Sequence, residues 1–169
     1  MIKKCFHLLI LPGFLFCGSV CFSETQIGLN AFTVEPNSEI EVTSNSMVFN
    51  NETKFTEFLD NVVIKYGKLT VKAKAMKISQ VSLSSPEESL EFRVEGPLEI
   101  SNGTSFIYGN NAFYSRKNQE ITVSGNVNLL QGSNKIFGDT LVLNLNNGLA
   151  KISGSVRTIL VPTGKNQNE

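Results

Sequence analysis

The sequence predicts an all-β protein, a twisted antiparallel β-jelly roll or coiled sandwich built from hairpin repeats of about 29 residues. Three observations lead to this fold class. Apolar residues alternate with period two along several segments, the chain matches itself at fixed offsets, and Gly and Asn recur where the alternation stops. Beyond the N-terminal apolar run no stretch shows helical periodicity, so strands are expected throughout.

The N-terminus has the layout of a secretory signal. Two lysines precede an apolar run of 18 residues, Cys5 to Phe22, and polar sequence follows. The run only just reaches the length of a spanning helix. We therefore expect a signal peptide of residues 1–23, cut between Ser23 and Glu24, and an exported mature protein. An uncleaved inner-membrane anchor is the alternative.

The composition of the mature chain excludes several kinds of site. All three cysteines and the single histidine lie in the signal, so disulfides, Cys or His metal sites, serine-histidine triads and Cys nucleophiles cannot form. The remaining 13 basic and 15 acidic residues give a net charge of −2, which does not suggest nucleic acid. We expect no cofactor and no metal.

Paired carboxylates are the one catalytic device left, and a glycosidase needs two that face each other across a cleft. Asp60 and Asp139 are the only aspartates, and they occupy different positions in their repeats. Nothing in the sequence brings them together. A protein without catalytic activity is therefore expected, and a carbohydrate-acting enzyme is the weaker alternative.

The repeat is visible by self-comparison. Residues 58–78 align without a gap on residues 123–143, at an offset of 65, and a third copy over residues 94–114 lies 36 residues after the first. Half-copies occupy Ile40 to Asn50 and Lys151 to Val161. The predicted domain spans residues 40–162, after a lead segment of residues 24–39 and before a disordered polar tail of residues 163–169, with a loop at Ser84 to Glu88.

Each unit starts as a strand, bends, and turns back. The equivalent mid-strand positions predict a bend or close backbone approach, because three of the four are glycine; they are Asp60, Gly96, Gly125 and Gly154. Hairpin turns are predicted at Gly67, Gly103 and Gly132. In the second strand of each unit the apolar residues move from one set of alternate positions to the other, at Met76, Ala112 and Leu141. Such a shift indicates a β-bulge or a corner.

The alternation places one set of apolar side chains on the inner face of the sheet. If the sheet closes, they form only a core; if it stays open along one seam, they line a groove that accepts lipid chains. Alternation alone leaves both readings open. The set comprises Val42, Phe49, Phe58, Val62, Ile64, Val71, Met76, Leu98, Ile100, Ile107, Tyr114, Val127, Leu129, Ile136 and Leu141.

The first hairpin carries a basic stretch, in which Lys72 and Lys74 lie on the face opposite the apolar side chains. The stretch comprises Lys65, Lys68, Lys72, Lys74 and Lys77, and the first four are the candidate phosphate contacts. One interpretation is a polar face that protects an edge from aggregation. The other is contact with the phosphates of an anionic glycolipid.

The chain resembles the periplasmic lipopolysaccharide-transport proteins of the LptA/OstA family from about Ile40 to Pro162. The resemblance is carried by an Ile-Glu-Val-Thr-Ser opening, by Asn-Val after Asp or Gly at residues 60–62 and 125–127, and by an Arg-Thr-Ile-Leu-Val-Pro ending at residues 157–162 before a short polar tail. It implies a jelly roll of V-shaped cross-section with lipid A acyl chains inside. It also implies head-to-tail self-association, and inner-membrane LptC-like and outer-membrane LptD-like partners.

The expected function is thus to shelter lipopolysaccharide and pass it from the inner to the outer membrane. Energy must come from an ATPase elsewhere, because the chain has no Gly-rich phosphate loop with its Lys. Two alternatives stay open. One is a membrane-anchored LptC-type partner of the same pathway, and the other is a structural β-solenoid surface protein that carries no glycolipid.

Overall fold

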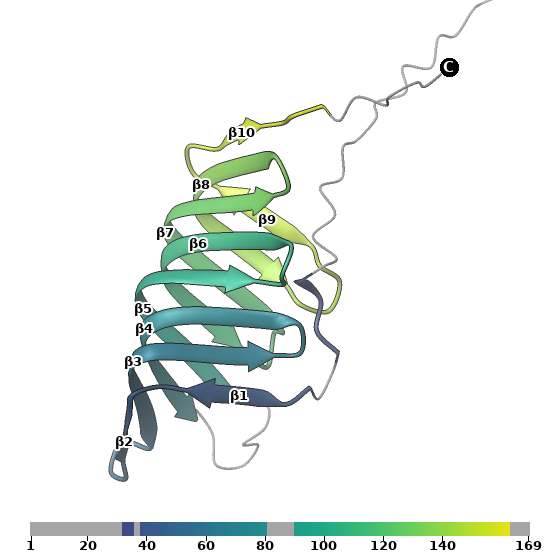
Figure 1. The fold of residues 1–169 in the computed structure, drawn as a ribbon. Helices are drawn as coiled ribbons and strands as arrows, with labels where there is room; N and C mark the ends of the chain where they lie inside the picture. Colours follow the sequence, from purple (N-terminus) through teal and green to yellow (C-terminus); the bar gives the residue numbers. More distant parts are fainter. Residues whose placement is uncertain (1–31, 36–37, 81–89, 163–169) are drawn as a thin grey trace, which may run out of the picture.

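The computed structural model describes residues 32–35, 38–80 and 90–162 (Figure 1). In this part of the chain ten antiparallel strands join in one open sheet, which confirms the all-β fold. The signal, most of the lead segment, the loop at Ser84 to Glu88 and the polar tail lie outside the described residues. The strands are β1 (Ile40–Thr43), β2 (Ser46–Asn50), β3 (Phe55–Tyr66), β4 (Leu69–Gln80), β5 (Leu90–Ser101), β6 (Ser105–Ser115), β7 (Glu120–Gln131), β8 (Asn134–Asn144), β9 (Ala150–Ser153) and β10 (Arg157–Ile159).

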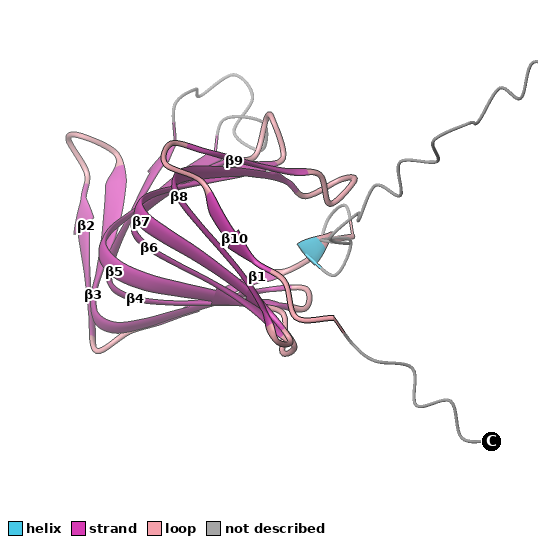
Figure 2. Cartoon of the chain, turned by 90° about the horizontal axis from the view of Figure 1, so that it is seen from above, coloured by secondary structure: helices cyan, strands magenta, loops and turns pink. Residues whose placement is uncertain are grey.

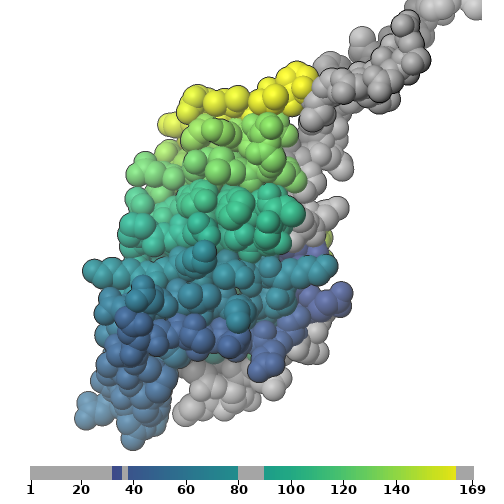
Figure 3. Space-filling model, viewed as in Figure 1, coloured from purple at the N-terminus to yellow at the C-terminus, as the bar shows by residue number. Residues whose placement is uncertain are grey.

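The strands are stacked in chain order along one axis. The long strands β3 to β8 pair consecutively, β1 and β2 both pair with β3, and β9 and β10 both pair with β8. Each end of the stack is therefore formed by two short strands instead of one long one. The colours in Figure 3 run in bands from the β1–β2 edge to the β10 edge, which shows the same order on the surface. No helix within the described ranges has the length and apolarity to cross a membrane.

The long strands bend in the middle. Asp60, Gly96, Gly125 and Gly154 all have positive φ, between 58° and 91°. The pairing register shifts at the first three of these places, for example between Leu59 and Val62. The left-handed conformation is open to glycine and tolerated by Asp, and it redirects the strand. The bend predicted from the mid-strand glycines is therefore present.

The bends divide the sheet into two arms. Seen along the stack in Figure 2, the arms diverge from the bends and leave one side open. Residues paired directly across antiparallel strands point to the same face, so each arm carries rows of inward side chains. One row in arm A is Val42, Ile64, Val71, Ile100, Ile107, Leu129, Ile136 and Thr158. One row in arm B is Met47, Phe58, Met76, Val94, Ala112, Val123, Leu141 and Ile152.

Most of the predicted inward residues are buried. Fourteen of the fifteen lie in the core or pack against it: Val62, Ile64, Met76, Leu98, Ile100, Ile107, Tyr114, Val127, Leu129 and Leu141 are buried, and Val42, Phe58, Val71 and Ile136 are partly buried. Phe49 differs from the prediction, because it is 59% exposed. It faces inward, but β2 pairs only with β3 and no further strand covers it.

Candidate functional site

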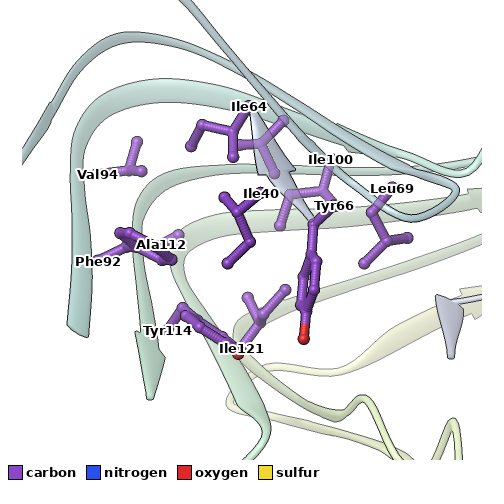
Figure 4. A pocket seen from close by; sticks show the side chains of 11 residues that line it. Ile40, Ile64, Tyr66, Leu69, Phe92, Val94, Ile100, Ala112, Tyr114 and Ile121 are labelled. Carbon is purple, nitrogen blue, oxygen red and sulfur yellow. The ribbon is translucent and has the colours of Figure 1, made fainter. Parts of the chain in front are cut away.

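An apolar groove lies between the two arms, toward the end of the stack that carries β1 (Figure 4). Its space, including the part open to solvent, measures about 500 Å³. It is lined by Ile40, Ile64, Tyr66, Leu69, Val71, Phe92, Val94, Ile100, Ala112, Tyr114 and Ile121.

The strand alternation builds the walls of this groove. Ile64, Val71 and Ile100 are consecutive neighbours in the arm A row. Phe92, Tyr114 and Ile121 are consecutive neighbours in a row of arm B. Because the arms meet at the bends, the two rows face each other across the groove instead of packing into one layer. The lining is apolar apart from the hydroxyl groups of its two tyrosines.

Aromatic packing holds Tyr114 in place. Its ring stacks on Phe92 at 5.3 Å between centroids and meets Tyr66 edge-on at 6.0 Å. Burial, and after it the phenol of Tyr66, raises the pKa of Tyr114 far above its ordinary value, while Arg116 acts weakly in the other direction. Tyr114 therefore stays neutral at physiological pH. Its Oη is buried, and the phenol of Tyr66 and the side chain of Gln119 are its polar neighbours.

A short segment before β1, which we call the N-terminal strap (Phe32–Glu35), covers part of the open side. The helical turn of this segment, cyan in Figure 2, lies between the free ends of the arms. Phe32 is fully buried, and the Val34 amide donates a hydrogen bond to the Leu145 carbonyl at 3.1 Å. A Cβ on Gly67, at the β3–β4 turn, would lie 3.3 Å from Cγ1 of Val34. The strap thus touches both arms and closes the mouth at this point.

The interior is filled toward β8. Leu141 and Leu143 on β8 and Leu145 just after it are fully buried, and Phe32 belongs to the same core cluster. The groove takes its lining from β1 and from β3 to β7, and none of its lining residues belongs to β8. The structure therefore has both a filled core and a groove, and that the groove accepts lipid chains stays a prediction.

The four lysines proposed as phosphate contacts do not line the groove. Lys65 forms an ion pair with Glu41 at 3.0 Å, and Lys72 pairs with Glu99 at 3.4 Å. Both lysines are well exposed, so each pair contributes little to stability. Lys68 lies in the β3–β4 turn and Lys74 at the register shift of β4, and both are exposed. Contact of these lysines with phosphate stays a prediction.

The two aspartates have separate structural positions. Asp60 is exposed at the bend of β3, where its carbonyl accepts a hydrogen bond from the Asn45 amide at 2.9 Å. Asp139 is exposed on β8, and its amide donates to the Gly154 carbonyl at 3.1 Å. In the described ranges no three His, Cys, Asp or Glu side chains gather as a metal site would require.

Both edges of the sheet expose apolar side chains. At one edge, Met47, Val48 and Phe49 of β2 are 49–59% exposed, and β2 projects beyond the body of the protein (Figures 1 and 3). At the other edge the exposed residues are Leu149, Val156, Ile159, Leu160 and Val161. Unpaired edge strands with apolar side chains are surfaces that another strand can extend.

The structure brings together only part of the predicted site. Ile64, Val71, Ile100 and Tyr114 line the groove, while the other predicted inward residues except the exposed Phe49 lie in the core or pack against it. Sequence reasoning missed seven lining residues. Phe92, Val94, Ala112 and Ile121 share the alternation of the predicted set and could have been found from it. Ile40, Tyr66 and Leu69 lie at strand ends, two residues beyond Val42, Ile64 and Val71, so the same alternation could have been extended to them.

Comparisons with known proteins agree with this fold. Residues 106–168 match the sequence profile of the family described as LptA/(LptD N-terminal domain) LPS transport protein. The structure is similar to the crystal structure of LptH, the LptA homologous periplasmic component of the conserved lipopolysaccharide transport device from Pseudomonas aeruginosa. The TM-score is 0.64, the identity 12%, and the match covers 74% of this chain and 96% of that chain. No curated protein matches the chain in sequence.

The predicted family resemblance is thereby confirmed. The profile match covers residues 106–168, from β6 to the C-terminal tail. The matched family is a transport family and not a family of enzymes. At 12% identity the structural likeness adds the fold, over nearly the whole length of the related protein.

Proposed function

We propose that this LptA/OstA-like protein of lipopolysaccharide transport binds lipopolysaccharide in the periplasm by sheltering lipid A acyl chains in the groove between its arms. The observation that carries the proposal is the groove itself, which is apolar on both walls and partly open to solvent. Each methylene removed from water contributes about 0.8 kcal/mol, so an acyl chain gains from lying there. The polar head group would remain at the open side, outside the apolar walls.

A charge in the groove tests this proposal. Ile64 is 6% exposed and lines arm A, while Lys72 pairs with Val63 in the same hairpin and points to the opposite face. We expect Ile64→Glu to abolish lipid binding, because a carboxylate there must be desolvated or held neutral by a raised pKa. The matched variant Lys72→Glu loses an exposed ion pair and should retain lipid.

The measurement is detergent-free purification followed by quantification of bound lipopolysaccharide. Circular dichroism must show that both variants are folded. Wild type without stoichiometric glycolipid, or equal retention by the two folded variants, would contradict the groove proposal and favour a structural solenoid.

We further propose that copies join head to tail and bridge the periplasm. The strand directions at the two edges are compatible. If two copies are stacked in the same orientation, β9 of one copy runs antiparallel to β2 of the next. The edges also match in register, because Met47 and Ile152 lie on the same arm B row, and Val42 and Thr158 on the same arm A row. Joining the edges would cover the exposed Met47 and Phe49 with β9 of the next copy.

Such a contact uses two different surfaces, so it is heterologous and extends into a filament unless the rotation closes a ring. The same edges are the surfaces that we assign to an inner-membrane LptC-like partner and an outer-membrane LptD-like partner. Sedimentation tests the assignment. Deleting residues 151–169 should leave a lipid-binding monomer, whereas the same oligomer series as the full mature chain would show that assembly uses another surface.

A further inference from the structure

The N-terminal strap places apolar side chains between the free ends of the arms. Phe32 is fully buried and Val34 is 8% exposed, and both belong to the core cluster. The Val34 amide donates to the Leu145 carbonyl, just after β8 at the free end of arm B. At the free end of arm A, a Cβ on Gly67 would lie 3.3 Å from Cγ1 of Val34. The strap therefore spans the open side from one arm to the other.

The groove borders the core to which the strap belongs. Ile121 lines the groove, and its direct partner on β8, Leu143, is fully buried in the core cluster that also holds Phe32. One row of arm B thus runs from the groove wall into this core without a break. A molecule that enters the groove from the open side meets the strap there.

The strap can leave without disturbing the sheet. Its residues belong to none of the described strands, whereas the long strands β3 to β8 are each paired on both sides. Segments outside the strand ladders open at a lower free energy than the strands themselves. The strap is held in part by the burial of Phe32 and Val34, and an acyl chain would gain free energy between the arms in the same way, by removing apolar surface from water.

We propose that the strap is a displaceable internal occupant, which holds the space between the free ends of the arms until a bound lipid releases it. This inference rests on the proposed function, because the displacing lipid is the ligand proposed for the groove. The strap and the head group of such a lipid both require the open side, so docking of the strap competes with binding. The apparent affinity is then the intrinsic affinity reduced by the fraction of molecules whose strap is released. Weakening the strap raises this fraction.

Titration of the full-length exported protein with the fluorescent fatty acid cis-parinaric acid measures this competition. We expect Phe32→Ala to bind the probe about tenfold more tightly than the wild type, although it is less stable, because its strap is released more often. Val34→Ala removes methyl groups that face the Gly67 turn, and it should bind the probe about threefold more tightly. If the strap only packed against the core, its loss would lower the stability and would not raise the affinity.

Val127→Ala is the matched control. Val127 is 1% exposed and pairs with Gly138 at the bend of β7, at the opposite end of the arms from the strap. Its truncation weakens the core but not the strap, so the affinity should not exceed that of the wild type. Adding Ile64→Glu to Phe32→Ala should abolish the gained binding, because Ile64 lines the groove. Circular dichroism must show that each variant is folded.

Hydrogen exchange of the wild type gives a readout that needs no variant. Saturation with the probe should accelerate exchange at the Val34 amide, which bonds to Leu145, and should not accelerate it at Ile107 on β6. Unchanged or slower exchange at Val34, or strap variants that bind no more tightly than the wild type, overturns the role of the strap and leaves the groove proposal intact. If neither the wild type nor Phe32→Ala binds the probe, both proposals fail.

Discussion

Replacing Gly109 with alanine tests how tightly the two arms are folded on each other. Gly109 lies on β6 at the bend, and its φ is outside the left-handed region, so alanine meets no backbone penalty there. The added Cβ would overlap Cγ1 of Val123 and lie 3.4 Å from the Ser124 carbonyl oxygen. Val123 is fully buried on β7 and cannot move aside into solvent. The whole cost of the substitution should therefore come from this one contact.

The expected magnitude follows from overpacking. Adding a methyl group to a filled core costs about 1–3 kcal/mol, partly offset by about 0.5–1 kcal/mol for replacing a strand glycine. We expect Gly109→Ala to lower the free energy of unfolding by about 1–2 kcal/mol. Val123→Ala removes two methyl groups and should cost about 2 kcal/mol or more. The double variant should be more stable than the sum of the two single-variant losses predicts, since the methyl group added at position 109 can occupy the space left by the Val123 side chain.

Guanidinium unfolding of the four proteins of this double-mutant cycle measures the coupling. Gly103→Ala with Val123→Ala provides the control, because Gly103 has φ 91° and no atom within 4 Å of its added Cβ. Its cost is conformational and should be additive with that of Val123→Ala. If the Gly109 pair is also additive within about 0.5 kcal/mol, the inferred contact at the bend does not exist.

Two further predictions concern the strap and the buried tyrosine. Phe32→Ala removes a fully buried ring and should lower the free energy of unfolding by about 3 kcal/mol. Hydrogen exchange at the Val34 amide, which bonds to Leu145, should accelerate more than at Ile107, and unchanged Val34 exchange would show that the strap does not depend on Phe32. Because burial raises the folded-state pKa of Tyr114 above its unfolded value of about 10, its contribution to stability is complete below about pH 10 and falls as the pH rises further. Unfolding at about pH 8 and about pH 11 should show a larger alkaline loss for the wild type than for Tyr114→Phe, and equal losses would contradict the assigned burial.

Local rules were sufficient to predict the strands and their bends. Alternation depends only on neighbouring residues, and a mid-strand glycine has few uses other than a bend, so Gly96, Gly125 and Gly154 could be read from the sequence. Asp60 was placed with them by the repeat, and it shares their positive φ. The 29-residue unit itself remains an inference from self-comparison.

Phe49 shows where these rules end. Alternation predicts which face a side chain occupies, and Phe49 does lie on the inner face. Burial depends in addition on whether a neighbouring strand exists, and β2 has a neighbour on one side only. Phe32 and Val34 were missed for a related reason. They belong to no alternating segment, and their burial depends on the packing of the strap against the sheet.

Whether an inward side chain lines the groove or fills the core depends on how much space the surrounding side chains occupy. The alternation of apolar residues does not encode this. The arm B row that borders the groove continues as Tyr114, Ile121 and Leu143 from β6 to β8. Tyr114 and Ile121 line the groove, whereas Leu143 is fully buried in the core cluster that also holds Leu145 and Phe32. The groove therefore lies toward the β1–β2 edge, where Met47 and Phe49 are exposed, and not toward β8. In the proposed head-to-tail assembly, the β9 edge of the neighbouring copy would lie next to the β1–β2 edge of this one. The groove would then lie close to the junction between the two copies.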